Sequence, residues 1–324
     1  MIKAKKYNIP IFIPHEGCPH DCVFCNQRKI TGVETSVTAD DVRKITEEYL
    51  SRINSDDAYV EVAFFGGSFT GLTLEKQEEF LKAASEYSKH IDGIRASTRP
   101  DYINDEILSL AKRYNVRTIE LGLQSADNEV LRKNGRGHTF EDCERASGLI
   151  KKYGISLGIQ MMVGMYGSNP EKDIRTAKEA VRLKPDCARI YPTLTLDKTK
   201  LKELYERKEY KPYDMETAID VTDKMMKILE DNGVEIIRVG LHSDESLLSD
   251  GNIVAGPYHP AFKELVLGRR KRFEIEEYIK KNNIKNCILP IKTDKSKASE
   301  IVGHKRCNAE YFKEKYNVIL KIQY

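Results

Sequence analysis

Long apolar runs are missing from this 324-residue sequence. No stretch approaches the roughly 20 apolar residues that a membrane-spanning helix needs, so no membrane association is expected. The basic segment 1–6 is followed by a short apolar stretch with two prolines and no small-residue cleavage site, so no signal peptide is expected either. The net charge of +3 is small, and overall charge therefore gives no argument for nucleic acid as a partner.

A regular cysteine framework is also missing. The seven cysteines are an odd number at irregular spacings, which argues against a secreted disulfide scaffold and favours a reducing cytoplasm. With 40% hydrophobic and 32% charged residues, the chain has the composition of a soluble globular protein rather than a disordered one. Its length allows one large α/β domain and a smaller appendage.

Three cysteines near the N-terminus are closely spaced. Cys18, Cys22 and Cys25 form a C-x3-C-x2-C pattern directly after the apolar run 9–14, which is typical of a buried strand. Thiolates are soft ligands for zinc or iron–sulfur centres. The next cysteine is Cys143, so three protein ligands would leave one metal position open for a substrate or a cofactor. A zinc-bound or free-thiol loop is the alternative.

Strand-like and helix-like segments alternate along the first 200 residues. Helices are expected from Thr38, which with Asp41 could form an N-terminal cap, and at 74–89 and 104–114. Strands are expected at 1–16, 59–65, 91–97, 116–123, 155–163 and 188–191. This alternation predicts an α/β fold with parallel strands and crossover helices, and six such units are too few to close an eight-stranded barrel.

The loops that follow these strands hold the chemically notable residues. In parallel α/β sheets the carboxyl ends of the strands gather at one edge, where ligands bind. That edge is predicted to carry the loops 18–25, 66–69, 97–101, 124–125, 164–167 and 191–193. One active site, built from all of these loops, is therefore expected.

The cysteine spacing, with the aromatic Phe24 before the last cysteine, resembles that of the radical S-adenosylmethionine (SAM) enzymes. The resemblance implies that Cys18, Cys22 and Cys25 hold a [4Fe–4S] cluster whose fourth iron is chelated by SAM. It implies that an electron, from a donor such as flavodoxin or ferredoxin, splits SAM into methionine and a 5′-deoxyadenosyl radical. The implied fold is an open partial (β/α)6 barrel over residues 1–238, with a small C-terminal extension over 239–324 for substrate binding or docking.

Further motifs match SAM-binding positions of this family. Gly66-Gly67-Ser68 resembles the glycine-rich motif whose backbone meets the SAM amino group, although a tight turn is the simpler interpretation. Gln124 and Arg136 stand at the separation found in the oxygen-independent coproporphyrinogen oxidases, and Arg136 could pair with the SAM carboxylate. Ser97 departs from the family, which usually has glutamate there. The residues that the resemblance assigns to SAM are Phe24, Gly66, Gly67, Ser68, Ser97, Arg99, Gln124, Arg136, Gln160 and Met162.

Two later segments, 189–201 and 210–213, resemble the radical SAM domain of the Elongator catalytic subunit, which modifies wobble uridines of tRNA. The resemblance covers roughly residues 8–240 and involves several independent motifs. Nothing in the sequence has the length or glycine pattern of that subunit's acetyltransferase domain, so acetyl-CoA chemistry is not expected. The resemblance implies that RNA, in particular tRNA, is the substrate.

Three residues are expected on the substrate side of the site. Tyr191 ends the last predicted strand, and His242 and His259 lie in turn-rich segments where side chains can face a pocket. Histidines that form hydrogen bonds within their turns are the alternative interpretation.

The C-terminal region contains clusters of basic residues. Arg269 and Arg270 begin a run of four cations at 269–272, and further basic residues follow at 292–297 and 304–306. Such a run is usually a solvated face, but beside a deep site it is the pattern expected for contacts with a phosphate backbone. RNA docking through Arg269 and Arg270 is therefore the first hypothesis.

Three functions stay open at this point. The first is a radical SAM enzyme that modifies RNA, and the second is radical chemistry on a small molecule or a tetrapyrrole, because Gln124 and Arg136 also match the porphyrin branch. The third is a haem- or cluster-carrying chaperone with the same fold. Formation of 5′-deoxyadenosine separates the enzymes from the chaperone, and co-purified nucleic acid separates the two enzymes from each other.

Overall fold

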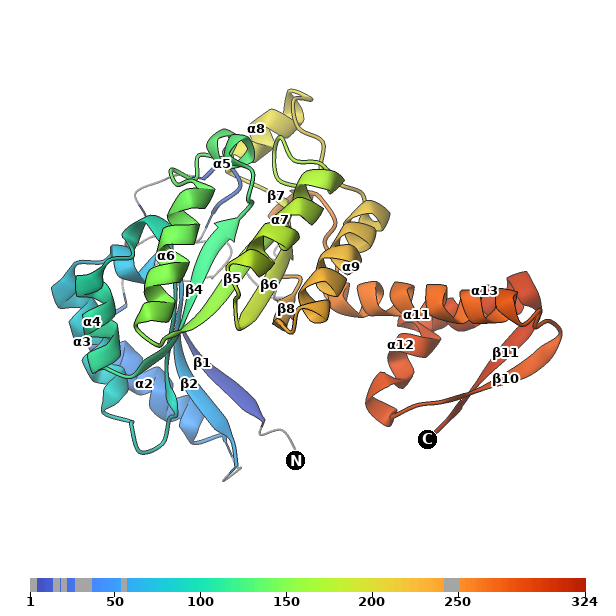
Figure 1. Cartoon of the computed structure of the whole chain (residues 1–324), viewed down its shortest axis with the longest axis horizontal. Helices are drawn as coiled ribbons and strands as arrows, with labels where there is room; N and C mark the ends of the chain where they lie inside the picture. Colours follow the sequence, from blue (N-terminus) through green and yellow to red (C-terminus); the bar gives the residue numbers. More distant parts are fainter. Residues whose placement is uncertain (1–4, 14–17, 19–21, 27–36, 54–56, 242–250) are drawn as a thin grey trace.

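The structure is a computed structural model, and it describes residues 5–13, 18, 22–26, 37–53, 57–241 and 251–324. Its main feature is a parallel sheet of seven strands, and their order in the sheet follows the chain (Figure 1). The strands are β1 (Lys6–Ile13), β2 (Tyr59–Gly66), β3 (Gly93–Thr98), β4 (Val116–Gln124), β5 (Ser156–Val163), β6 (Cys187–Pro192) and β8 (Glu235–Val239). The sheet is an open partial barrel, which confirms the predicted fold.

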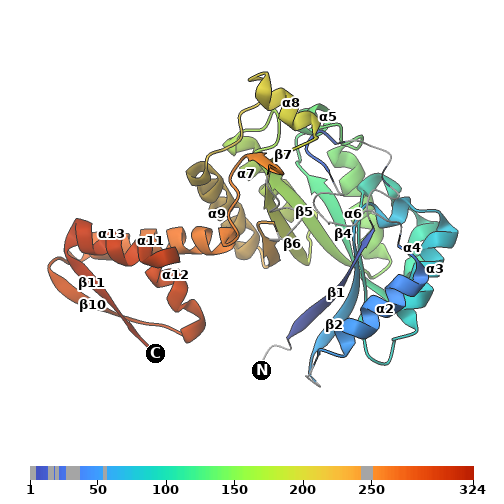
Figure 2. The ribbon, with the colours of Figure 1, turned by 180° about the vertical axis from the view of Figure 1, so that it is seen from behind.

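Helices connect the strands and pack on one side of the curved sheet (Figure 1), whereas the view from behind looks onto the strands (Figure 2). The predicted cap of α2 is present as a complete capping box, in which Thr38 and Asp41 bond each other's backbone N–H groups. No helix in the described part of the chain is long and apolar enough to cross a membrane. The helices around the sheet are α2 (Ala39–Leu50), α3 (Leu74–Ser85), α4 (Asp105–Arg113), α5 (Asn128–Lys133), α6 (Phe140–Lys152), α7 (Pro170–Arg182), α8 (Lys200–Glu206) and α9 (Met215–Asp231).

The strand β8 was missed by the interpretation of the sequence, which expected six strands. It follows the long helix α9 and pairs in parallel with β6. Its sequence, Glu-Ile-Ile-Arg-Val, contains the β-branched residues that favour strands. The barrel is therefore one strand wider than predicted and still open. Outside it, two short strands, β7 (Thr195–Leu196) and β9 (Ile253–Ala255), form an antiparallel pair.

Side chains alternate between the two faces of the sheet, as successive residues of a strand must. Ile94 of β3 and Ile119 of β4 are buried in the main hydrophobic core with the helices. Their neighbours Arg95 and Glu120 project to the opposite face, which we call the inner face of the barrel. The inner face and the carboxyl ends of the strands together form the candidate site.

A smaller unit follows the barrel. The helix α11 (Phe262–Lys281) begins in the main core, where Phe262 and Val266 are buried, and ends in a separate core with Ile275 and Phe312. Figure 1 shows this unit projecting to the side of the barrel, beyond α9. We define the C-terminal unit as residues 271–324; besides the end of α11 it contains β10 (Cys287–Lys292), α12 (Ala298–Val302), α13 (Cys307–Tyr316) and β11 (Val318–Gln323). The predicted boundary at residue 238 stays a prediction.

Candidate active site

Four charged side chains from four strands meet on the inner face of the barrel. Arg95 of β3 lies between the carboxylates of Glu61 and Glu120, with an N···O distance of 2.8 Å to each. Arg189 of β6 approaches the same Glu120 at 2.6 and 2.9 Å. Glu61, Arg95 and Glu120 are buried, and Arg189 is nearly so. Two acids and two bases thus neutralise one another; we call them the inner ion network.

The inner ion network fixes the strands β2, β3, β4 and β6 relative to one another. Burial opposes ionisation of Glu120, but the guanidinium groups of Arg189 and Arg95 outweigh burial and hold the pKa of Glu120 below its usual value. Its carboxylate therefore stays charged. The sequence interpretation assigned no role to these residues, although charged residues inside otherwise apolar strands were the available signal.

The predicted residues of the inner face lie next to this network. Gln160 Nε2 donates to Ser97 Oγ at 3.0 Å and to Glu120 Oε2 at 3.1 Å. The hydroxyl of Tyr191 lies 3.4 Å from Arg189 Nη1, and burial raises the pKa of Tyr191, which keeps the phenol neutral. The structure thus brings together on one face Ser97, Gln160, Met162 and Tyr191.

At the carboxyl ends of the strands, the cysteine loop meets the loop that carries Arg136. Arg136 Nη1 donates to Cys22 Sγ at 3.3 Å, and its Nη2 donates to the carbonyl oxygen of Gly122 at 2.9 Å. A backbone bond of 3.1 Å from Val23 N to Asn134 O lies beside this contact. Two residues that the sequence placed in one site, 114 positions apart, are therefore in direct contact.

Gln124 and Arg99 complete this corner of the site. Gln124 is the last residue of β4, and its φ of +64° turns the chain out of the strand while its side chain stays buried. Arg99 donates from Nη2 to the carbonyl oxygen of Arg136 and to Asp101 Oδ2. Arg99 therefore holds the backbone of the loop that presents Arg136.

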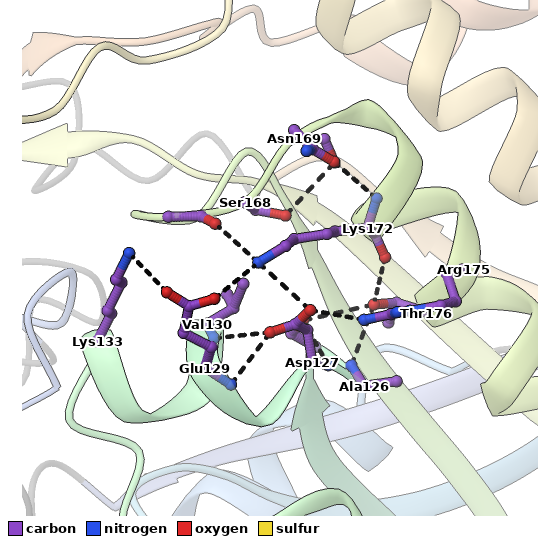
Figure 3. Close-up of polar contacts among 12 residues, drawn as sticks. Ala126, Asp127, Glu129, Val130, Lys133, Ser168, Asn169, Lys172, Arg175 and Thr176 are labelled. Carbon is purple, nitrogen blue, oxygen red and sulfur yellow. Dashed lines mark hydrogen bonds and ion pairs between the residues drawn. The ribbon is translucent and has the colours of Figure 1, made fainter.

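Polar contacts between α5 and α7 fix the start of that loop (Figure 3). Asp127 accepts hydrogen bonds from the first backbone N–H groups of α5, and its carboxylate pairs with Lys172 at 3.3 Å and Arg175 at 2.5 Å. Thr176 accepts a backbone hydrogen bond of 3.0 Å from the same turn. Because α5 leads directly to Arg136, these contacts hold the guanidinium at the strand ends.

The glycine-rich motif after β2 forms a close backbone contact. Gly66 has a φ of +100°, and a Cβ there would lie 3.0 Å from the carbonyl oxygen of Ile13. Gly67 N donates to the same oxygen at 2.6 Å. Ser68 Oγ lies 2.9 Å from Thr98 Oγ1 and links the ends of β2 and β3. The two glycines thus allow β1 and β2 to end side by side.

Several buried polar atoms in this corner have no hydrogen-bond partner among the described residues. They are Arg99 Nη1, Asp101 Oδ1, Gln124 Oε1, Asn134 Oδ1, Arg136 Nε and His138 Nδ1. Burial of such atoms is costly unless a ligand or water satisfies them. Guanidinium donors and an amide acceptor suit the carboxylate and amino groups of an amino acid, so this corner fits the methionine part of SAM.

His138 lies at the edge of the same corner and is buried. Burial, together with the positive charges of Arg136 and Arg99, lowers the pKa of His138 to about 3. The imidazole is therefore neutral at physiological pH, and it adds no third positive charge to the two arginines.

The cysteine loop is described only in part, because residues 14–17, 19–21 and 27–36 lie outside the described residues. Within the described chain, no three His, Cys, Asp or Glu side chains are grouped so that they could hold a metal ion. Phe24 and Cys25 are half-buried, and Cys22 is buried. The assignment of the cysteines as cluster ligands therefore depends on their spacing and on the position of Cys22 beside Arg136.

The predicted substrate residues beyond residue 238 make their contacts elsewhere. His242 lies outside the described residues. His259 packs against His304, with the ring centroids 4.9 Å apart. Arg269 pairs with Glu216 and Asp220, and Arg270 with Asp223 and Glu230, all on α9. These two guanidinium groups join α11 to α9. Their charges are therefore neutralised within the protein and are not available to bind RNA.

Comparison with known proteins finds relatives named as tRNA uridine(34) acetyltransferases and as Elongator complex protein 3. The tRNA uridine(34) acetyltransferase of Methanocaldococcus jannaschii is 28% identical over 262 residues, which cover 68% of this chain and 48% of that protein. Elongator complex protein 3 of Schizosaccharomyces pombe is 29% identical over 171 residues, 52% of this chain and 31% of that protein. The chain thus spans about half the length, or less, of these curated relatives.

A solved structure and two family models agree with these relatives. The archaeal Methanocaldococcus infernus Elp3 with an N-terminal deletion superposes with a TM-score of 0.65 at 25% identity, covering 87% of this chain and 64% of that chain. The model of the radical SAM C-terminal domain matches residues 185–272, and the model of the radical SAM superfamily matches residues 12–180. Members of this superfamily use a [4Fe–4S] cluster and SAM, as the cysteine motif predicted. The chain belongs to the radical SAM superfamily and is a radical SAM enzyme.

Proposed function

We propose that this enzyme modifies RNA, with a nucleoside of tRNA as the substrate. The observation that carries the proposal is the contact between Arg136 and Cys22 at the strand ends, in a chain whose relatives are named for tRNA uridine modification and for Elongator. That contact supports one site in which a cysteine-bound cluster and a SAM-binding arginine act together. The radical step alone is proposed, because the chain spans only part of those relatives.

In this proposal Cys18, Cys22 and Cys25 hold the cluster, and an electron donor of the flavodoxin or ferredoxin type is the redox partner. Arg99, Gln124 and Arg136 would bind the polar end of SAM, since they carry the unsatisfied buried atoms. The backbone at Gly66 and Gly67, with Phe24 and Met162, would line the rest of the cofactor. When bound, the two groups supply a radical able to take a hydrogen atom from the substrate.

The inner face below the strand ends would receive the substrate nucleoside. The inner ion network gives this face a rigid floor without net charge, which does not repel a neutral base. Gln160 and Tyr191 contact the network through Glu120 and Arg189, and both side chains can donate and accept hydrogen bonds with a base edge. Ser97 is tied to Gln160 and would orient its amide.

The proposal is tested by incubating reduced, cluster-reconstituted enzyme with SAM and total cellular RNA. We expect more 5′-deoxyadenosine than in the RNA-free control, and none from a Cys22→Ala variant that has lost a cluster ligand. The matched control is Cys287→Ala, because Cys287 is exposed on β10, in the separate C-terminal unit. Equal 5′-deoxyadenosine with and without RNA would contradict RNA as the substrate.

The same assay separates the two alternatives. Stimulation by an RNA-free small-molecule extract, but not by RNA, would favour chemistry on a small molecule or a tetrapyrrole. A reduced enzyme that binds SAM but forms no 5′-deoxyadenosine under any condition would favour the cluster- or haem-carrying chaperone.

A further inference from the structure

Positive charge is concentrated in the C-terminal unit, although the whole chain is nearly neutral. Residues 271–324 contain thirteen Lys and Arg against seven Asp and Glu, whereas the rest of the chain contains 40 against 43. The unit thus has a net charge of +6 and the barrel a net charge of −3. A charge asymmetry of this kind indicates a polyanionic partner for the basic part.

The cations at the start of this region are occupied by contacts within the protein. Arg269 and Arg270 pair with acids on α9, and Arg272 stacks over the ring of Tyr311, with its guanidinium carbon 4.9 Å from the ring centroid. Lys271 approaches Glu274 at 2.6 Å. Arg269 and Arg270 therefore attach the unit to the barrel and Arg272 covers its core, so that these three arginines are not free for a binding surface, whereas Lys271 faces the hollow described next.

A second group of lysines surrounds a hollow in the unit. The hollow is open to solvent and has a volume of about 490 Å³ between the end of α11, the end of β10 and the start of α12. Lys292 and Lys297 line it, and Lys295 stands beside it, 5.7 Å over the ring of Tyr324. These three lysines are exposed, and none forms an ion pair with an acid in the described part of the chain. Lys271, Glu274 and Asp294 also line the hollow, and because Lys271 pairs with Glu274, Asp294 is the one remaining acid beside the three lysines among the described lining residues.

Lysine side chains beside an exposed aromatic ring are a combination that suits nucleic acid. Tyr324 is 69% exposed, and exposed aromatic side chains among lysines can stack on bases while the cations meet phosphates. The lysine ammonium groups are point charges on flexible side chains. They can contact the phosphate backbone of a nucleic acid but make no base-specific contact. The hollow would therefore contribute affinity rather than sequence specificity.

The position of the hollow favours RNA over an acidic redox protein. The described cysteine loop contacts α8 through the backbone bond from Leu201 N to Val23 O, and α8 lies at the upper end of the barrel in Figure 1. The C-terminal unit lies to the side, beyond α9 (Figures 1 and 2). A compact electron donor docked on this unit would not face the cysteines, whereas an extended polyanion can reach both places.

We infer that the hollow lined by Lys292 and Lys297, together with Lys295, docks the phosphate backbone of the RNA substrate at a distance from the reacting nucleoside. This inference rests on the proposed function and assigns its docking surface. It places recognition of the RNA body in the C-terminal unit and chemistry at the strand ends of the barrel.

The test compares RNA binding by two full-length, cluster-reconstituted variants with equal loss of charge. In K292Q/K295Q/K297Q the three proposed contacts are removed. In the control K82Q/K89Q/K112Q three exposed lysines are removed in or just after α3 and α4, helices that lie on the side of the barrel away from the C-terminal unit (Figure 1). For unfractionated tRNA at 0.15 M salt, we expect the first variant to bind roughly 170-fold more weakly, because three lost phosphate contacts lower the slope of log K against log salt by about 2.7. The control should change little in either quantity.

Each outcome decides between the possibilities. Equal weakening of both variants would show non-specific charge and overturn the inference, and so would unchanged binding in the first variant. A different result would be that flavodoxin no longer reduces the cluster of the first variant, although this variant binds tRNA normally. The hollow would then dock an acidic protein, and the inference would be wrong. Wild-type enzyme that binds no RNA at all would remove the proposed function as well. Formation of 5′-deoxyadenosine without RNA should be equal in all three proteins.

Discussion

The guanidinium group of Arg136 joins two parts of the site, because Nη1 lies 3.3 Å from Cys22 Sγ and Nη2 lies 2.9 Å from the carbonyl oxygen of Gly122. One side chain thus contacts the cysteine loop and the end of β4. Its Nε is buried and has no partner among the described residues. The planar guanidinium group of arginine can donate hydrogen bonds from three separate nitrogen atoms to partners on different sides. The single nitrogen atom of lysine cannot replace all three.

Replacement of Arg136 should therefore weaken SAM binding without loss of iron. A hydrogen bond to a charged group contributes about 1.5–3 kcal/mol, so we expect Arg136→Ala to raise the Kd for SAM by roughly 10- to 100-fold. Arg136→Lys should recover little of this loss. Equilibrium dialysis with labelled SAM measures the Kd, and iron analysis verifies the cluster. Arg132→Ala, on the exposed side of α5, is the control, and an unchanged Kd in Arg136→Ala would remove this residue from the pocket.

Asp173 in α7 should make stability depend on pH. Burial raises the pKa of Asp173 to about 6, against the opposing hydrogen bonds from Ser168, Gly164 and Tyr213. Because the folded state binds this proton more tightly than the unfolded chain, the stabilisation is complete below pH 4 and is lost as the pH rises through 6. The full change amounts to about 3 kcal/mol, from a shift of roughly 2 pH units.

The measurement for Asp173 is urea unfolding of the wild type and Asp173→Asn between pH 4.5 and 8. We expect the variant to lack this decrease, so that its stability relative to the wild type improves as the pH rises. If the asparagine also loses hydrogen bonds, the free energy of unfolding would fall by the same amount at every pH, and its dependence on pH would not change. Asp231→Asn, at the exposed end of α9, should follow the wild type. Parallel curves for Asp173→Asn and the wild type would contradict the raised pKa.

The strand ends could be predicted from the sequence because the signals there are local. A strand followed by a loop with glycine, cysteine or arginine places that loop at one edge of any parallel sheet. This placed Cys22, Gly66, Arg99 and Gln124 at one end of the barrel, where the structure has them, whereas Arg136, which follows α5, was assigned to the same pocket only by the family resemblance. Periodicity also predicted six of the seven strands, and β8 was missed although its apolar residues give a strand signal.

Contacts between distant segments could not be predicted in the same way. Which acid pairs with Arg95 depends on the register of β2, β3 and β4, and no local pattern encodes that register. The ion pairs of the run 269–272 could not be predicted either. In the sequence Arg269 and Arg270 resemble a solvated patch, but in the structure they pair with acids of α9. Charge in a sequence indicates a binding surface only after the internal ion pairs are known.

Glu120 is the member of the inner ion network that contacts both arginines. Glu120→Gln would leave Arg95 and Arg189 buried with only Glu61 as a counter-charge, and removal of one partner from a buried pair typically costs 3–5 kcal/mol. We expect a loss of about that size in guanidinium chloride unfolding. Glu48→Gln is the control, since its pair with Arg52 is exposed and contributes about 1 kcal/mol or less. Equal stability of the two variants would show that the network is not structural.

Phe312 offers a test of whether the C-terminal unit unfolds separately from the barrel. Its side chain is fully buried in the small second core with Ile275 and Val318, and that core shares no buried residue with the main one among the described residues. Phe312→Ala should cost about 3–5 kcal/mol, which a core of this size cannot absorb. We expect faster hydrogen exchange in residues 271–324 alone, weaker tRNA binding, and unchanged SAM affinity. Phe273→Ala, at a 49% exposed position, should leave exchange unaltered. Because the first turns of α11 are buried in the main core, exchange that also accelerates in β4 and β5 would mean that the two units unfold together.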